Sequence, residues 1–181
     1  MLDAHKGQTL LHLARAAIAD KLGFVPGDYP RTGWLEEHGA TFVTLNMEGR
    51  LRGCIGSLEA YRPLIDDVRN NAVAAAFYDP RFHPLDKDEF ARVAIEVSLL
   101  GTPEPIQFSS EHDALARLNP GNDGVILEYG RLRATYLPQV WAQLPDPQSF
   151  ISHLKTKAGL PENFWSDDIR LSRYTVEKWK E

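Results

Sequence analysis

The stretch ATFVTLNMEGRLRGCIGSL, residues 40–58, contains two strand-like runs separated by a tight turn. Residues 40–46 are rich in β-branched and aromatic side chains, which favour a strand. Residues 47–50 form the turn, and residues 51–58 continue as a second strand. The stretch therefore predicts a β-hairpin.

The residues on either side of this hairpin alternate between helical patterns and turns. Apolar residues spaced three to four apart, an early Pro63 and a capping box of Asp86 and Glu89 are typical of helices. In order, the sequence predicts a helix over 10–22 ended by Gly23, a turn-rich segment over 26–38, a helix over 64–76 stopped by Asp79-Pro80, and a short helical turn after Asp86.

The second half of the chain begins with its clearest strand, residues 93–99, in which apolar residues alternate with others. Next come a connector over 102–105, a helix over 113–118, a turn over 120–124, a hairpin of 125–128 and 132–137, short helices over 138–141 and 148–158, and a strand over 171–178. Helices and strands follow one another without a βαβ rhythm. This order predicts an α+β fold with a mixed, mostly antiparallel sheet and flanking helices.

Composition places the chain among globular domains and excludes several classes of protein. The chain has 181 residues, of which 43% are hydrophobic and 25% charged, so one domain is expected. A net charge of −5 disfavours binding to nucleic acid or to an anionic membrane. One cysteine excludes an intrachain disulfide framework and a multi-thiolate zinc site. We expect no metal and no cofactor, because the common metal and dinucleotide motifs are absent.

Targeting signals are also missing from the sequence. Residues 1–8 (MLDAHKGQ) lack the basic and apolar regions of a secretory signal. The longest strongly apolar run, residues 73–77, is far shorter than the roughly 20 residues of a membrane helix. A lone thiol is typical of a reducing compartment, so we expect a cytoplasmic protein.

The segment LRGCIG, residues 51–56, is the strongest candidate for chemistry. Alternation along a strand predicts Leu51 and Ile55 in the core, with Arg50, Arg52, Cys54 and Gly56 on the opposite face. An arginine close to a thiol favours the thiolate, so Cys54 is a candidate nucleophile. In the alternative interpretation Cys54 is an inert small hydrophobe, and the glycines admit the alanine-rich helix.

A second dense patch, DPRFHP, occupies residues 79–84. His83 is a candidate general base, and a nucleophile pair of Cys54 with His83 or His153 is conceivable. In the alternative interpretation Asp79 and Arg81 only hold the loop in place. Nearby arginines form a locally basic patch that suits a small anion, an acidic partner or merely solvent: Arg50, Arg52, Arg62 and Arg69.

These segments together resemble the AMMECR domain family, and the resemblance covers nearly the whole chain in order. Its blocks are LRGCIG (51–56), RPL (62–64), NAVAAAF (71–77), DPRFHPL (79–85), IEVS (95–98), GVI (124–126), LPQVW (137–141), residues 150–160 and YTVE (174–177). The chain is most similar to the bacterial branch called the A proteins of AmmeMemoRadiSam systems. The resemblance implies one domain over 1–181, with a larger and a smaller lobe around a cleft.

The resemblance also implies a site and partners. It suggests that residues from three segments and from the helix near residue 153 face one cleft: Arg52, Cys54, Asp79, Arg81, Gln139 and His153. Together with the residue patterns above, the candidate catalytic residues are Cys54, His83 and His153. The candidate ligand-binding residues are Arg52, Gly53, Gly56, Asp79, Arg81 and Gln139. The expected partners are a Memo-like protein, a radical SAM protein and a small anionic ligand. Some relatives carry a second cysteine near His153; its absence here argues against a two-thiol redox mechanism.

Three functions follow as hypotheses. The leading one is an accessory protein whose cleft, with Cys54 beside Arg52, binds or covalently holds a small anion or a partner segment. The second is a pure protein-interaction module with a structural Cys54. The third is a cysteine-dependent hydrolase. Whether the protein is an enzyme is left open by its sequence.

Overall fold

The chain forms two compact units in a computed structural model that describes residues 2–24, 29 and 33–181. Unit 1 comprises Met1–Leu100 and Glu177–Glu181, and unit 2 comprises Gly101–Val176. The predicted turn-rich segment 26–38 lies largely outside the described residues. Within its described part, Gly33–Leu35 forms the 3-10 turn η1.

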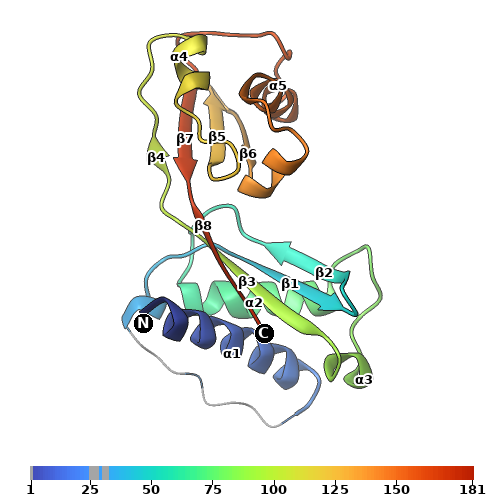
Figure 1. The fold of residues 1–181 in the computed structure, drawn as a ribbon. Coiled ribbons are helices and arrows are strands. Elements are labelled where there is room, and N and C mark those ends of the chain that lie inside the picture. Colours follow the sequence, from blue (N-terminus) through green and yellow to red (C-terminus); the bar gives the residue numbers. More distant parts are fainter. Residues whose placement is uncertain (1, 25–28, 30–32) are drawn as a thin grey trace. The chain divides into compact units, whose positions relative to one another are not determined.

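Unit 1 contains a four-stranded sheet covered on one face by helices. Its strands are β1 (Thr41–Met47), β2 (Arg50–Gly56), β3 (Ala94–Leu100) and β8 (Val176–Lys180), in the order β2-β1-β3-β8. β1 runs antiparallel to both β2 and β3, so the predicted hairpin is confirmed. The two long helices α1 (Leu2–Lys21) and α2 (Leu64–Phe77) lie on the same face of the sheet (Figure 1).

The helices of unit 1 follow the sequence signals closely. α1 begins earlier than the predicted residue 10. In this additional part of the helix, Gly7 lets the ring of Trp179 pack closely, since a Cβ at Gly7 would lie 2.3 Å from that ring. The short α3 (Lys87–Phe90) begins with the predicted capping box, in which Asp86 and Glu89 each accept a backbone N–H.

The core of unit 1 is an apolar layer between the sheet and these two helices. Alternate residues of the strands supply one side of it, including the fully buried Val43, Leu45, Ile95 and Val97. The helices supply the other side with leucine, isoleucine, valine and alanine side chains. The alternation predicted for residues 93–99 is therefore confirmed as the core-facing pattern of β3.

A buried polar cluster joins α2 to β1 beside this core. Asp67 is fully buried and accepts hydrogen bonds from the backbone N–H and the hydroxyl of Thr41, both at 2.7 Å. Ser57, Arg62 and Asn71 donate to the same carboxylate. Since an unpaired buried charge is costly, this cluster specifies how α2 docks on the sheet. It also pairs Arg62, which the sequence placed in a solvated or ligand-binding patch.

The close approach of β2 to α2 requires a glycine. A Cβ placed on Gly53 would lie 2.1 Å from the carbonyl oxygen of Ala75, which is a backbone atom of α2. The hypothesis that the glycines admit the alanine-rich helix is thus confirmed at Gly53. At Gly56 a Cβ would meet the ring of Phe42 at 2.2 Å instead.

The prediction that Leu51 points into the core is wrong. Leu51 is 43% exposed. The pairing of β1 with β2 shifts between Leu45, which faces Gly53, and Asn46, which faces Leu51. Arg52 lies in this bulge, and a bulge bends its strand and interrupts regular alternation. The alternation that places β2 side chains in the core therefore holds from Gly53 onward and does not include Leu51, which lies near the start of this edge strand.

Unit 2 has its own sheet, helices and core. Its elements are β4 (Glu104–Pro105), α4 (Glu111–Ala116), β5 (Gly124–Tyr129), β6 (Leu132–Tyr136), the 3-10 helix η2 (Pro138–Ala142), α5 (Pro147–Ala158) and β7 (Arg170–Tyr174), with strand order β4-β7-β5-β6. The rings of Trp141 and Phe150 stack at 3.8 Å in the core. Gly159 ends α5 at φ 92°, as its position in the sequence predicted.

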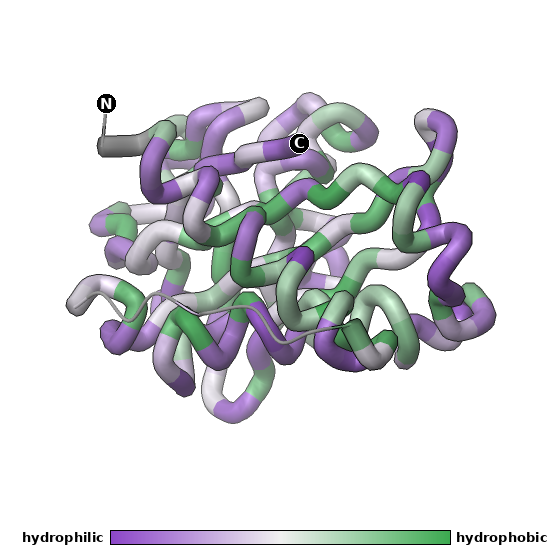
Figure 2. Tube along the Cα trace, turned by 90° about the horizontal axis from the view of Figure 1, so that it is seen from below, coloured by the Kyte–Doolittle hydropathy of each residue, from purple (hydrophilic) through white to green (hydrophobic). Residues whose placement is uncertain are grey.

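The predicted strand over 171–178 is in fact two strands that belong to different units. Residues 170–174 pair with β5 in unit 2, whereas β8 joins the sheet of unit 1. The α+β class is confirmed. Among the described residues no helix has the length and apolarity needed to cross a membrane. Hydrophilic and hydrophobic residues alternate in short runs along the trace (Figure 2).

Replacing Gly53 by alanine should destabilise unit 1, because the new Cβ meets backbone rather than a movable side chain. Overpacking of this kind costs about 1–3 kcal/mol or more. The matched control is Gly33→Ala, where nothing lies within 4 Å of the new Cβ. Thermal unfolding of both variants checks this; equal stability of Gly53→Ala and wild type would contradict the close-approach argument.

Candidate functional site

Cys54 lies in the edge strand β2, on the sheet face opposite the helices. It pairs in register with Thr44 on β1, whose hydroxyl donates a hydrogen bond to Sγ at 3.3 Å. Cys54 is partly exposed. The thiol is therefore neither sealed in the core nor fully open to solvent.

Two side chains of the loop after α2 form hydrogen bonds with the backbone N–H and carbonyl of Cys54. Asp79, only 3% exposed, accepts the N–H of Cys54 at 2.9 Å. Arg81 donates from Nη2 to the carbonyl of Cys54 at 3.3 Å. An edge strand leaves such groups without a strand neighbour, and here two side chains take that place.

Asp79 and Arg81 also form an ion pair with each other. Arg81 donates to the carboxylate from Nε at 2.9 Å, from Nη2 at 2.7 Å and from its backbone N–H at 3.1 Å. The hydrogen bond from the Arg81 side chain holds the pKa of Asp79 well below its usual range, with backbone N–H donors adding to the effect and burial opposing it. The same bond raises the pKa of Arg81, whose side chain stays 53% exposed.

Arg52, the cation that the sequence placed beside the thiol, is instead buried and paired. It is 5% exposed and donates to Glu89 from Nε at 2.9 Å and from Nη2 at 2.8 Å. Nη2 also donates to the carbonyl of His83 at 2.9 Å, whereas Nη1 is buried without a hydrogen-bond partner. The bond from Arg52 is the main reason that the pKa of Glu89 is lowered. The charge of Arg52 is thus largely compensated by Glu89.

Phe82 lies close to both arginines of this site. The guanidinium carbons of Arg52 and Arg81 are 5.7 and 5.5 Å from the centroid of its ring. Cations near a ring face are attracted by the ring quadrupole. The loop 79–83 therefore holds Arg52 on the buried side and Arg81 on the exposed side.

The histidines are placed differently from a nucleophile–base pair. His83 is exposed, and its Nε2 approaches Glu89 at 3.5 Å. In unit 2, His153 is exposed and its Nδ1 lies 2.8 Å from the carbonyl oxygen of Ser149 on α5. Among the described contacts, the side-chain partner of Sγ is Thr44 rather than a histidine. Gln139, the other candidate in unit 2, is exposed on η2.

Three residues of the site were missed by sequence reasoning: Thr44, Phe82 and Glu89. Glu89 did carry a signal, because its spacing from Asp86 predicted the capping box, but that signal concerned the helix and not Arg52. Thr44 follows only from the register of β1 and β2. In the described part of the chain no three His, Cys, Asp or Glu side chains are grouped as metal ligands.

Asp79→Asn should remove stability in a pH-dependent way. Because the folded pKa of Asp79 lies below its unfolded value, ionised Asp79 stabilises the fold above pH about 4, and this stabilisation is lost as the pH falls. We expect the variant to be less stable at pH 7 by about 1–3 kcal/mol, the cost of unsatisfied buried donors. The difference should shrink between about pH 5 and 2.

Melting temperatures of wild type and variant over this pH range check the prediction. Asp88→Asn, at an exposed position of α3, is the control and should change stability by less than about 0.5 kcal/mol. A difference between Asp79→Asn and wild type that stays constant with pH would show that the charge of Asp79 is not what matters.

The chain matches known proteins over almost its full length. The family model AMMECR1 matches residues 11–179. A protein of Methanothermobacter thermautotrophicus is 36% identical over 187 residues, covering 99% of this chain and 96% of the relative. Protein MJ0810 of Methanocaldococcus jannaschii is 34% identical over 188 residues, with 100% and 92% covered.

A crystal structure of an uncharacterized protein from Pyrococcus horikoshii, PH0010, has the same fold. It superposes with a TM-score of 0.79 at 34% identity, covering 97% of this chain and 91% of that one. Together with the family match over residues 11–179, this agreement confirms the predicted resemblance. The chain belongs to the AMMECR1 family.

Proposed function

We propose that this protein binds a small anionic ligand at Cys54, with Arg81 as the cation that receives it. The observation that carries the proposal is the exposure of the Arg81 side chain, 53%, while its partner Asp79 is buried beneath it. The carboxylate is thus occupied by N–H donors on the protein side. The guanidinium presents its remaining N–H groups outward, next to a partly exposed thiol.

Arg52 has a positioning role in this proposal. Its bidentate bond to Glu89 and its bond to the His83 carbonyl hold the loop that carries Arg81. Gly53 and Gly56 admit α2 and the Phe42 ring rather than a ligand. The ligand-contacting residues are then Cys54 and Arg81.

The same proposal includes partners and a compartment. The site acts together with a Memo-like and a radical SAM protein in the cytoplasm, in an accessory role that includes thiol-dependent modification.

Arg81→Gln should selectively slow the reaction of Cys54 with an anionic reagent. Iodoacetate and iodoacetamide alkylate the same sulfur but differ in charge, so the ratio of their rates reports the local field. We expect the rate with iodoacetate divided by the rate with iodoacetamide to be about threefold to tenfold lower in Arg81→Gln than in wild type. The reason is that a charge at contact distance near the surface is worth about 1 kcal/mol. The effect should diminish at high salt.

Two further arginine variants make the test specific. Arg50→Gln, at an exposed position of the same strand, should leave the ratio unchanged. Arg52→Gln should change the ratio less than Arg81→Gln does, because it loosens the loop without removing the exposed cation. It should also lower stability by about 3 kcal/mol, because Glu89 loses its buried partner. A ratio that responds to Arg52 and not to Arg81 would assign the anion to Arg52. No response to either arginine would leave Cys54 and its loop a purely structural motif.

A further inference from the structure

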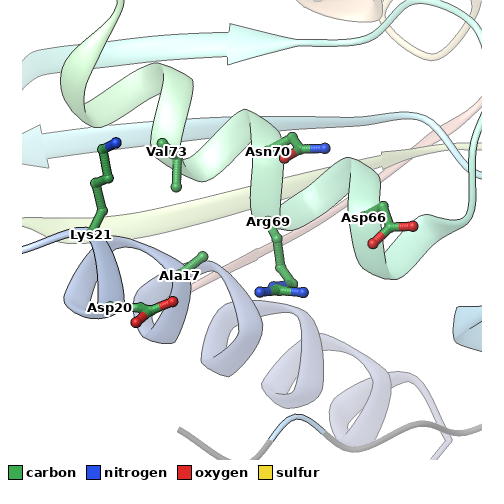
Figure 3. A pocket seen from close by; sticks show the side chains of 7 residues that line it. All are labelled: Ala17, Asp20, Lys21, Asp66, Arg69, Asn70 and Val73. Carbon is green, nitrogen blue, oxygen red and sulfur yellow. The ribbon is translucent and has the colours of Figure 1, made fainter. Parts of the chain in front are cut away.

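A pocket of about 350 Å³ lies between α1 and α2 of unit 1 (Figure 3). Cys54 is not among the residues that line it. The small side chains of Ala17 and Val73 form the apolar part of its lining. The polar part of the lining is Asn70 and four charged side chains from both helices: Asp20, Lys21, Asp66 and Arg69. This volume lies at the lower end of the range typical of small-molecule sites, about 300–1,000 Å³.

The polar groups of this pocket do not satisfy one another. Among the described residues, the side chains of Asp20, Lys21, Asp66 and Arg69 form no ion pair or hydrogen bond, although two are cationic and two anionic. In the view of Figure 3 the Arg69 guanidinium extends from α2 towards α1 and lies between the carboxylates of Asp20 and Asp66. The pocket is therefore lined by cationic and anionic side chains that are free to bind a ligand.

Arg69 is the best-defined recognition group of the pocket. Its guanidinium carbon lies over the ring of Tyr29, 4.0 Å from the ring centroid, which favours this position of the group. The Nε of Arg69 and the hydroxyl of Tyr29 are both buried without a hydrogen-bond partner. Leaving a buried donor unmatched costs about 1–3 kcal/mol. The planar edge of a guanidinium matches a carboxylate in particular.

The two rim carboxylates select the class of ligand. A phosphate dianion would be attracted by Lys21 and Arg69 but repelled by Asp20 and Asp66, whereas a ligand that carries both a carboxylate and an ammonium group complements both signs of charge. We propose that this pocket binds a free α-amino acid with a small apolar side chain. Its carboxylate is received by Arg69, its ammonium by Asp20 and Asp66, and its side chain packs on Ala17 and Val73. The proposal is independent of the function proposed for Cys54.

Calorimetric titration of the full chain with L-valine tests the proposal. We expect saturable binding of one L-valine per chain. Valinamide lacks the carboxylate and N-acetyl-L-valine lacks the ammonium group, so each should bind at least about tenfold more weakly, the loss of one charged hydrogen-bonding group. Inorganic phosphate should not compete.

Variants locate the binding in this pocket. Arg69→Gln should weaken L-valine binding about tenfold or more, and Asp66→Asn should weaken it less because Asp20 remains. Arg92→Gln removes an exposed arginine elsewhere in unit 1 and should leave affinity unchanged. Circular dichroism verifies that each variant is folded.

Several outcomes would overturn the proposal. They are the absence of saturable L-valine binding, equal binding of valinamide and L-valine, and unchanged affinity in a folded Arg69→Gln variant. The comparison of the three ligands uses wild-type protein, so it decides the question even if a variant fails to fold.

Discussion

The contact between Gly53 of β2 and the backbone of α2 is the constraint on which the rest of unit 1 depends. Because no side chain separates the strand from the Ala75 carbonyl, the end of α2 arrives directly beside β2. Asp79 then reaches the N–H of Cys54, and Arg81 reaches its carbonyl. Gly53, which is required for the close packing of β2 on α2, thus also determines which charged groups surround the thiol of Cys54.

Unit 1 compensates its buried charges locally. Asp67 is bonded to Arg62, Glu89 to Arg52 and Asp79 to Arg81, so each of these three carboxylates meets an opposite charge. The three pairs differ in exposure, and only Arg81 is more than half exposed. This difference, rather than the number of arginines near the thiol, decides which cation is able to meet a ligand. The patch of arginines seen in the sequence therefore separates into members with distinct roles.

Much of the fold was predictable because its signals are local. The hairpin, the capping box at Asp86, the alternating strand β3 and the Gly159 stop each depend on neighbouring residues, and each is confirmed. The bulge at Arg52 was not predictable, since it arises from pairing with β1 and has no composition signal. The buried Asp67 and Lys155 were missed for a related reason: their partners Thr41 and Glu111 are 26 and 44 residues away along the chain. In the candidate site the residue types were predicted but the pairing of Arg52 with Glu89 was not.

The fourth strand of unit 1 lies beyond unit 2 in the chain. β8 extends the first sheet, Trp179 packs on Gly7, and Arg15 of α1 is bonded to Glu181. A ribosome releases the chain from its N-terminus, so residues 1–100 emerge while their closing strand is still unmade. Unit 2 is continuous over 101–176 and is complete first. During synthesis the edge of β3 that later pairs with β8 thus stays unpaired until the end of the chain has been made. An unpaired strand edge of this kind is prone to pair with the wrong strand.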